Sequence, residues 1–498
     1  MTGLWRMRSV TLLRAWARRD AVSMLSLRTY ASRSRAAKAS IEPMPLPCID
    51  QHEMRQSRVM AGSQHVGSAA SQKDEMLGPE PSYTDIVSGY DIFFCDEPFA
   101  LDYGSVLPSY QIAYETWGTL NAARDNAILL HTGLSASSHA ASTPRNTSKG
   151  WWEDFIGPGK ALDTNKFFVV CTNVLGSCYG STGPSSAHPL DADGAPYATR
   201  FPVLSIFDMV RAQFQLLDHL GIDTLYASVG SSLGGMLSIA AAHLFRERVG
   251  RVISISGCAR SAPSGIALRY AQRSVLMADE NWNRGFYYGP NQVQPHKGMK
   301  LARQIATITY RSGPEWEQRF GRRRHTQRSP ALCPDFLVET YLDHQGEQFC
   351  LKYDANSLIY ISKAMDLFDM TDDALAELGA ARMEAHGDDG NLPVERIDHA
   401  PASPKRRPHI TTISHPGAHA YVPSLARGLR RLHDVPILIL GVQSDILFPV
   451  EQQRELAECI RMNGNTSVMY YEIDAPHGHD SFLIDVANVG GAIKGFLN

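Results

Sequence analysis

Short apolar runs recur along the chain from about residue 85 onward and are separated by clusters of Gly, Pro and Asn. Runs of this length without polar alternation predict strands that are buried on both faces of a sheet. Six such runs occur, at 128–131, 167–173, 224–229, 251–256, 435–440 and 467–473. Helical patterns lie between several of them, at 206–220, 237–245 and 451–460. This alternation predicts an α/β fold with a mostly parallel sheet and helices on both faces.

The alternation stops between residues 258 and 430, where the pattern becomes helical. Helices are predicted at 299–310, 333–345, 357–367 and 374–384. A helical block within an α/β chain predicts an inserted lid, so we expect core parts at 85–257 and 431–498 around a helical lid at 258–430. The stretch near 386–419 is polar and rich in Pro, Asp and His, which predicts a disordered loop within the lid.

The first 40 residues differ in composition from the rest of the chain. They contain eight Arg, one Lys and a single acidic residue, Asp20, with Leu and Trp interleaved. This composition is typical of a mitochondrial transit peptide, whereas Arg14, Arg18 and Arg19 interrupt the apolar run that a secretory signal needs. We therefore expect a transit peptide at 1–40, a linker at 41–84 and a location in the mitochondrial matrix.

Charge and cysteine content exclude several classes of partner. The net charge is −3, from 48 basic and 51 acidic residues, so nucleic acid is not an expected partner. No stretch approaches about 18 uninterrupted apolar residues, so no membrane span is expected. The eight cysteines form no CxxC pair, which argues against a disulfide framework and against zinc or another metal.

The candidate chemistry begins at Gly230-Ser231-Ser232-Leu233-Gly234, which matches the G-x-S-x-G pattern. A predicted strand precedes this pattern and a helix rich in small residues follows it. Glycines on both sides allow the sharp, strained strand-to-helix turn that exposes a serine hydroxyl. The start of the following helix offers backbone N–H groups to a developing oxyanion. Ser232 is therefore the candidate nucleophile.

A serine nucleophile requires a histidine base, and that base requires a carboxylate to orient it. Asp445 follows the predicted strand 435–440, and His479 follows the predicted strand 467–473. The chain order Ser232, Asp445, His479 is the order found in α/β-hydrolases. His477 is an alternative base in the same loop.

Several separated segments resemble the homoserine/serine O-acyltransferase family of the α/β-hydrolase fold. They are 131–135, 151–154, 173–184, 230–236, 301–311, 444–449 and 478–480. The resemblance implies an oxyanion hole formed by the backbone N–H groups of Leu233 and Gly133. It also implies that Arg303, with Tyr310 nearby, holds the carboxylate of an amino acid, that Asp480 holds its ammonium group, and that the protein is a homodimer.

These substrate-binding assignments also make physical sense, because a fixed Arg and a fixed Asp can hold the opposite charges of a free amino acid. Arg303 and Tyr310 are seven positions apart, about two helical turns, and so share one face of a helix.

The first loop reads His131-Thr-Gly-Leu-Ser135 and departs from the pattern of family members that act on homoserine. Together with 281–283 and 287–288, it resembles the subgroup acting on serine, which includes fungal mitochondrial serine O-acetyltransferases and bacterial serine O-succinyltransferases. The resemblance implies ping-pong transfer of an acetyl group from acetyl-CoA to L-serine, for cysteine biosynthesis, without a bound cofactor. Four alternatives stay open: homoserine O-acetyltransferase, serine O-succinyltransferase, an esterase or thioesterase, and a noncatalytic binding protein.

Overall fold

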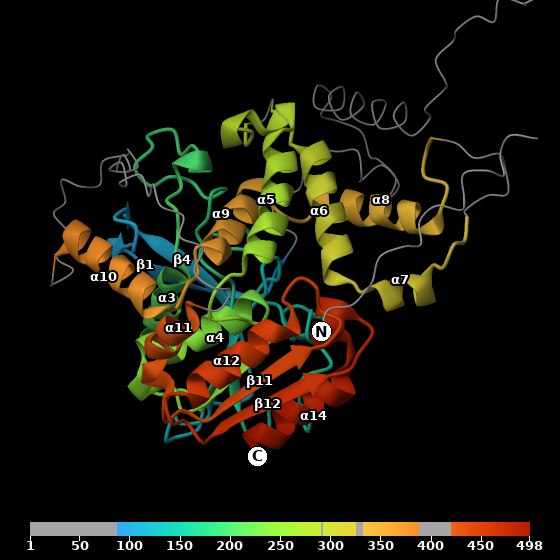
Figure 1. The fold of residues 1–498 in the computed structure, drawn as a ribbon. Coiled ribbons are helices and arrows are strands. Elements are labelled where there is room, and N and C mark those ends of the chain that lie inside the picture. Colours follow the sequence, from blue (N-terminus) through green and yellow to red (C-terminus); the bar gives the residue numbers. More distant parts are fainter. Residues whose placement is uncertain (1–86, 290–291, 325–331, 388–419) are drawn as a thin grey trace, which may run out of the picture. The chain divides into compact units, whose positions relative to one another are not determined.

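The computed structural model describes residues 87–289, 292–324, 332–387 and 420–498 (Figure 1). Its central sheet has eight strands in the order β1-β4-β8-β5-β9-β10-β11-β12. Their bounds are β1 Asp91–Cys95, β4 Tyr110–Trp117, β5 Ala127–His131, β8 Phe168–Thr172, β9 Ala227–Ser231, β10 Val252–Ile255, β11 Ile437–Val442 and β12 Val468–Ile473. Strands β8 to β12 in this order run parallel, whereas β1 and β4 pair antiparallel. The predicted α/β class with a mostly parallel sheet is confirmed.

The apolar runs of the sequence are the parallel strands of this sheet, and they are buried on both faces. Leu129 of β5 and Ile439 of β11 belong to one hydrophobic cluster, whereas their neighbours Leu130 and Leu440 belong to another. Successive side chains of a strand point to opposite faces, so a strand covered on both sides needs apolar residues at every position. The two clusters therefore correspond to the two faces of the sheet.

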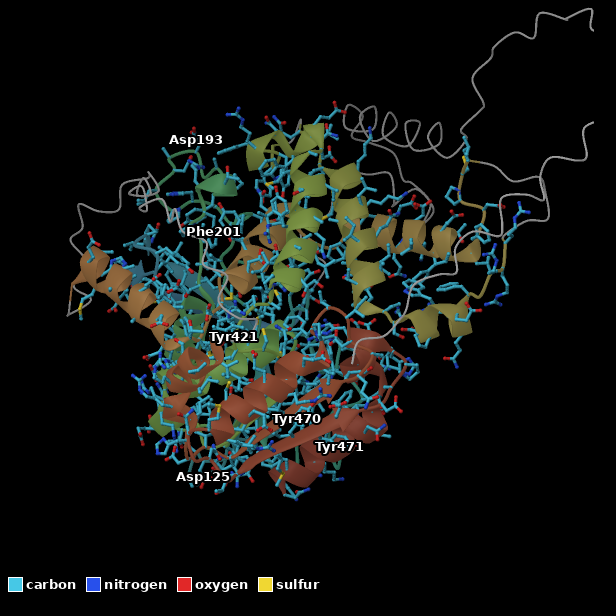
Figure 2. The ribbon with its side chains drawn as sticks, viewed as in Figure 1. Asp125, Asp193, Phe201, Tyr421, Tyr470 and Tyr471 are labelled. Atoms are coloured by element: carbon cyan, nitrogen blue, oxygen red, sulfur yellow. The ribbon has the colours of Figure 1, made fainter. Side chains whose placement is uncertain are left out.

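Helices cover each face. Helices α3 (Ile206–His219), α4 (Leu233–Leu244) and α12 (Val450–Arg461) contribute to the first cluster. Helix α14 (Val486–Leu497) contributes to the second. At the sheet edge, β12 alternates instead: Tyr470 packs against the first cluster, while Tyr471 is 44% exposed (Figure 2).

Between β10 and β11 the chain forms the helices of the expected lid. They are α5 Pro263–Met277, α6 His296–Tyr310, α7 Gly313–Arg319, α8 Leu337–Cys350, α9 Ala355–Asp366, α10 Asp372–His386 and α11 Val422–Gly428. Figure 1 shows α5 and α6 side by side, where they pack together. Most of the predicted 386–419 loop, together with the predicted transit peptide and linker, lies outside the described residues.

The smaller elements complete the chain. Two pairs of short strands are β2 Phe99–Ala100 with β3 Val106–Leu107, and β6 Ile156–Gly157 with β7 Leu162–Asp163. A short helix, α13 Ser481–Ile484, precedes α14. Short 3₁₀ helices are η2 Ala198–Arg200, η3 Arg246–Arg248, η4 Glu280–Gly285, η6 Arg430–Leu432 and η7 Gly478–Asp480.

Some boundaries at the centre of the sheet differ from those predicted, and two of them lie next to Ser232. Strand β9 continues to Ser231, two residues beyond the predicted end, because it pairs with β10 through Ser231 and with β5 through Gly230. Helix α4 begins at Leu233, four residues before the predicted start. Gly230 and Ser231 carry no apolar signal, so the pattern missed the extension of the strand. Only Ser232 separates the strand from the helix.

Three features of the described residues bear on other functions. No described helix is both long and apolar enough to cross a bilayer. No group of three or more His, Cys, Asp or Glu in the described ranges is placed to hold a metal ion. Cys178 is buried, and burial raises the pKa of its thiol well above the ordinary value, which is typical of a structural cysteine.

Candidate active site

Ser232 occupies the turn between β9 and α4 with φ 59° and ψ −121°. A side chain in this region of backbone space is strained, which is typical of a serine raised for reaction. The two motif glycines are required by close packing. A Cβ atom on Gly230 would lie 2.1 Å from the carbonyl oxygen of Gly234, and one on Gly234 would lie 2.4 Å from that of His131.

The predicted oxyanion donors lie on the two chain segments next to this turn. Leu233 is the first residue of α4, where backbone N–H groups have no partner within the helix. Gly133 follows β5 and lines the same cavity as Ser232. Two side chains from other segments donate hydrogen bonds to the loop that contains Gly133. The Tyr353 hydroxyl donates to the carbonyl of Leu134 at 2.8 Å, and the Trp151 indole donates to the carbonyl of Ser137 at 2.9 Å.

His479 and Asp445, the predicted base and its orienting carboxylate, are in direct contact. Nδ1 of His479 lies 2.6 Å from Oδ2 of Asp445. The other carboxylate oxygen accepts hydrogen bonds from the backbone N–H groups of Leu447 and Phe448 at 2.9 and 2.8 Å. The Phe448 ring stacks on the imidazole at 5.1 Å. These contacts fix the orientation of the histidine ring.

The other imidazole nitrogen of His479, Nε2, is buried and has no hydrogen-bond partner among the described residues. His479 and Ser232 line the same cavity. His477, the alternative base, is not among the lining residues. The structure therefore favours His479 as the base for Ser232.

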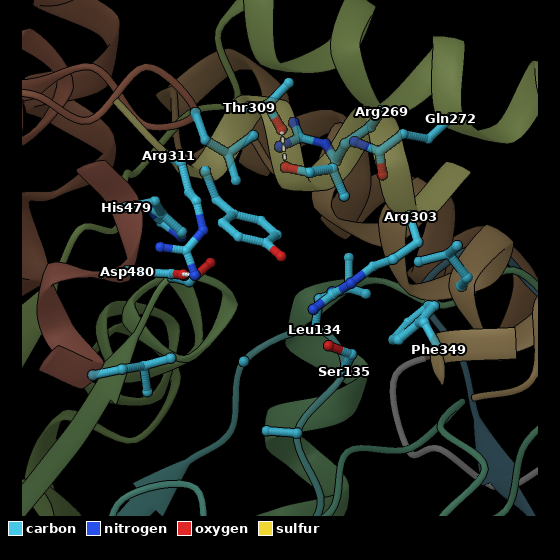
Figure 3. Close-up of a pocket in the computed structure, with 18 of the residues that line it drawn as sticks. Leu134, Ser135, Arg269, Gln272, Arg303, Thr309, Arg311, Phe349, His479 and Asp480 are labelled. Carbon is cyan, nitrogen blue, oxygen red and sulfur yellow. Dashed lines mark hydrogen bonds and ion pairs between the residues drawn. The ribbon is translucent and has the colours of Figure 1, made fainter. Parts of the chain in front are cut away.

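The cavity has a volume of about 380 Å³. Its floor comes from loops at the carboxyl ends of the strands, and its walls come from α5, α6, α8 and α9 of the lid. Figure 3 shows Arg269 and Gln272 of α5, Arg303 of α6 and the pair His479 and Asp480 arranged around it. The core supplies the reactive groups, and the lid supplies most of the charged groups.

Arg303 and Tyr310, predicted to share a helix face, both line the cavity from α6. The Arg303 guanidinium lies over the Tyr310 ring at 5.2 Å and over the Phe349 ring at 4.5 Å. Its Nε is buried and bonds none of the described residues. A guanidinium held between aromatic rings with donors left over is suited to bind a carboxylate.

Asp480 lines the cavity next to His479, but it has a partner that the sequence analysis did not assign. Nη2 of Arg311 lies 3.4 Å from Oδ2 of Asp480, and Nη1 of Arg311 contacts Glu315. Burial raises the pKa of Asp480, an effect that the neighbouring Arg311 opposes. Arg311 directly follows Tyr310 within a matched segment, and this position was the only signal that could have identified it.

Arg269 and Gln272 were also missed by the sequence analysis. Both line the cavity from α5, the one long lid helix that the pattern did not predict. The buried face of α5 includes Arg269, Gln272 and Arg273, so it lacks the apolar stripe by which helices are recognised.

The segments 281–283 and 287–288, which resemble the serine subgroup, do not line the cavity. The hydroxyls of Tyr287 and Tyr288 donate to the buried carboxylate of Asp354 at 2.7 and 2.9 Å. The Trp282 indole donates to Asn356 at 2.9 Å. These hydrogen bonds connect η4 and the two residues Tyr287 and Tyr288 to the start of α9, away from the residues that line the cavity.

A serine on a strained strand-to-helix turn, beside a histidine held by a buried aspartate, defines a nucleophilic serine enzyme of the α/β-hydrolase class. A family model described as alpha/beta hydrolase fold matches residues 126–486. A serine O-succinyltransferase of Emericella nidulans is 54% identical over 95% of this chain and 92% of its own length. One from Schizosaccharomyces pombe is 50% identical over 98% and 99%. The chain belongs to the homoserine/serine O-acyltransferase family within the α/β-hydrolase fold.

Solved structures agree with this assignment. The homoserine O-acetyltransferase from Bacillus anthracis superposes with a TM-score of 0.65 at 26% identity, covering 82% of this chain and 97% of that one. Esterase E22 shares the fold with the same TM-score at 24% identity, covering 82% of this chain and 100% of the esterase. The protein is an O-acyltransferase of the homoserine/serine type.

Proposed function

We propose that this protein transfers a succinyl group from succinyl-CoA to the side-chain hydroxyl of L-serine. One observation carries the proposal: relatives 54% and 50% identical over nearly the whole chain are both named serine O-succinyltransferase. We propose succinyl as the acyl group in place of the acetyl group expected from the sequence. The expectation of acetyl depended on the composition of the leader, and the leader does not determine which acyl group the cavity accepts. The acceptor remains the one expected.

The reaction follows from the arrangement of Ser232 and His479. Ser232 Oγ attacks the thioester carbonyl carbon while Nε2 of His479 takes the hydroxyl proton. The C–S bond breaks, and CoA leaves with the proton from His479. The hydroxyl of L-serine then attacks the Ser232 ester, gives its proton to His479, and that proton returns to Ser232 Oγ. Backbone N–H groups of Leu233 and Gly133 stabilise the oxyanion of both steps.

The acceptor is oriented by the groups beside His479. Arg303 binds its carboxylate, and Asp480 binds its ammonium group, which directs the hydroxyl to Nε2. Asp480 also contacts Arg311, so the ammonium group would be a second cation beside a partly buried carboxylate.

The test is a comparison of kcat/KM for four pairs, in which succinyl-CoA or acetyl-CoA is combined with L-serine or L-homoserine. Succinyl-CoA with L-serine is expected to give the highest value. Preference for L-homoserine by about tenfold, or 1.4 kcal/mol, would overturn the acceptor and leave the mechanism intact. Rapid CoA release without any acceptor would indicate a hydrolase.

Ser232→Ala provides the control for this comparison. The variant should form no acyl-enzyme, so mass spectrometry of protein treated with succinyl-CoA should show acylation at Ser232 in the wild type only. Wild-type protein that turns over without acylation at Ser232 contradicts the ping-pong route.

For location, we propose import into the mitochondrial matrix, on the basis of the eight Arg and single acidic residue among the first 40 residues. A fusion of residues 1–45 to a fluorescent reporter should enter mitochondria. A matched fusion with Arg14, Arg18 and Arg19 changed to Gln should stay in the cytosol. Cytosolic wild-type fusion would contradict the proposal.

We further propose that the protein is a homodimer, as the family resemblance implies. Light scattering of the purified chain should give twice the mass of 54.9 kDa, less any processed leader. A mass equal to one chain at the concentration of the activity assay would refute it.

A further inference from the structure

We propose that the buried pair Glu115 and His139 positions the loop that carries Gly133, and so holds one of the two oxyanion donors in place for acyl transfer. The inference rests on the proposed function and adds two positioning residues to its mechanism. Neither side chain is among the described residues that line the cavity, so both act through the loop and not on a substrate.

The loop in question, residues 132–150, leaves the end of β5 and is described throughout. It contains no helix and no strand of the central sheet. Four of its residues line the cavity, namely Gly133, Leu134, Ser135 and Ala136, and Figure 3 shows Leu134 and Ser135 there. An N–H group stabilises an oxyanion effectively only if it already points to the place where the charge develops. Contacts from outside the loop must therefore fix its shape.

Glu115 lies on β4, and its carboxylate bonds this loop. The residue is 0% exposed. Its Oε2 lies 2.9 Å from Nδ1 of His139, and its Oε1 accepts from the Ser138 hydroxyl at 3.3 Å. The cost of removing a carboxylate from water largely offsets the attraction within a buried pair, so such a pair contributes little to stability. Both partners belong to the loop, which indicates that the carboxylate serves to fix the loop.

Both ring nitrogens of His139 are used within the protein. Nε2 lies 2.9 Å from the carbonyl oxygen of Ser148, and a carbonyl can only accept, so this nitrogen carries a proton. A second proton lies between Nδ1 and the Glu115 carboxylate. The ring therefore joins two parts of the loop to the sheet, and it has no nitrogen left to exchange a proton with a substrate.

Hydrogen bonds within the loop connect this anchor to the oxyanion donor. The backbone N–H of His139 donates to the Ser137 hydroxyl at 3.2 Å, and the N–H of Ala136 donates to the Gly133 carbonyl at 3.4 Å. A Cβ atom on Gly133 would meet no atom within 4 Å beyond its chain neighbours, so packing does not hold this residue. The direction of its N–H group therefore depends on how the loop is held.

The anchor is joined to the nucleophile through the sheet. Strand β4 pairs with β8, β8 with β5, and β5 with β9, which ends next to Ser232. The other two side chains that support the loop are Tyr353, between lid helices α8 and α9, and Trp151, in the cavity wall. Glu115 is the support that belongs to the sheet itself, so it fixes Gly133 relative to the nucleophile.

The test measures two quantities on the full chain. The first is the rate constant of Ser232 acylation, followed as CoA release without an amino acid, with whichever of succinyl-CoA and acetyl-CoA acylates the wild type faster. The second is the inhibition constant of butylboronic acid. Its boron bonds the serine oxygen, the hydroxyl proton passes to the histidine base, and the anionic tetrahedral adduct places a boron hydroxyl at the oxyanion position. Its affinity therefore reports on the oxyanion donors.

Three variants and one control are compared. Glu115→Gln removes the charge of the anchor, His139→Gln removes the ring that joins the loop to the sheet, and the third variant combines both changes. Asp102→Asn is the matched control, because Asp102 is also 0% exposed, pairs with Arg211 at 2.7 Å and is not among the described lining residues of the cavity.

We expect Glu115→Gln and His139→Gln each to slow acylation by about tenfold to hundredfold and to weaken butylboronic acid by a similar factor, because a displaced oxyanion donor affects both. The dissociation constant of CoA should stay within about threefold of wild type, since CoA carries no oxyanion to stabilise. The double variant should lose about as much as either single variant, because both changes remove one contact. Asp102→Asn should be less stable but keep the wild-type value of both quantities.

A folded Glu115→Gln or His139→Gln protein with the wild-type acylation rate and boronic acid affinity would overturn the inference and leave the proposed function standing. If neither folds, Ser138→Ala decides, since it removes only a hydroxyl that donates to Glu115, and a loss of about threefold in both quantities is expected. An equal loss in Asp102→Asn would overturn the inference, because any buried carboxylate would then have the effect. Wild-type protein that neither donor acylates would overturn both.

Discussion

At the scale of single residues, Arg303, the proposed ligand of the acceptor carboxylate, lies in an aromatic setting. Its guanidinium lies over the rings of Tyr310 and Phe349, and no described carboxylate forms an ion pair with it. Stacking restricts the side chain before the substrate arrives, so little conformational entropy is lost on binding. Lysine can supply the charge but neither the planar fork nor the stacking.

Arg303→Lys is therefore expected to raise KM for the amino acid by about tenfold or more while the rate of Ser232 acylation stays near wild type. Steady-state kinetics with the amino acid varied, together with CoA release in its absence, separates the two effects. An equal loss in acylation would mean that Arg303 serves the donor instead of the acceptor.

Asp445 acts through His479, since it contacts the imidazole and two backbone N–H groups but does not line the cavity. Asp445→Asn should slow acylation by about 10³-fold to 10⁴-fold, because the wrong histidine tautomer is then favoured. The matched control is Asp474→Asn, an exposed residue in the loop between β12 and His479. Comparable rates in the two variants would exclude the orienting role.

At the scale of elements, the end of β5 has a buried histidine that couples stability to pH. His131 bonds Gln213 at 3.1 Å and Ser228 at 2.8 Å, and burial lowers its pKa to about 3. In the unfolded chain a histidine titrates near about pH 6.5. Below that pH the unfolded state binds a proton that the folded state does not, so stability falls as pH falls toward about 3.

The free energy of unfolding should therefore lose up to about 1.4 kcal/mol per pH unit through His131 as the pH falls from about 6 to 4. Urea unfolding at several pH values should show a shallower dependence for His131→Gln than for wild type. His433→Gln, at an exposed position, should keep the wild-type slope. Equal slopes in all three proteins would contradict the assignment.

Helix α5 depends on a buried carboxylate for its position in the lid. Asp366 of α9 is 3% exposed and binds Arg269 and Arg273, both on α5. Asp366→Asn leaves two buried guanidinium groups without a counter-charge and should destabilise the fold by about 3–5 kcal/mol. Asp372→Asn, which breaks a more exposed pairing with Arg427 and Arg430, should have little effect. Similar unfolding midpoints for the two variants would refute this.

At the scale of the whole molecule, the sheet brings distant segments to one edge. Strands β5, β9 and β11 run parallel, so the loops carrying Gly133, Ser232 and Asp445 leave the sheet at the same side. His479 follows β12 in the same way. The helices between β10 and β11 then close the space above these loops.

The described lining residues of the cavity all lie between Gly133 and Leu483. A chain lacking residues 1–40 should therefore keep the kcat/KM of the full chain, because no described part of the reactive site is removed. Assays of the two purified proteins with the same donor and acceptor check this. A loss beyond about tenfold would show that the leader contributes to the enzyme itself.

The sequence alone determined the α/β class, the six parallel strands and the order of Ser232, Asp445 and His479. It could do so because each rests on local information: apolar runs mark strands buried on both faces, and catalytic groups follow strand ends. The antiparallel strands β1 and β4 lacked such runs, since β1 has exposed positions and β4 mixes polar with apolar residues.

Only the tertiary structure decided the polar side of the cavity. Arg269 and Arg311 have no local pattern that separates them from surface residues, because their partners Asp366, Asp480 and Glu315 come from other elements or other turns. The sequence named His479 as the base and kept His477 as an alternative, and the contact of His479 with Asp445 supports that choice. Burial and charge pairing are properties of the packed chain, so a pattern of single positions cannot contain them.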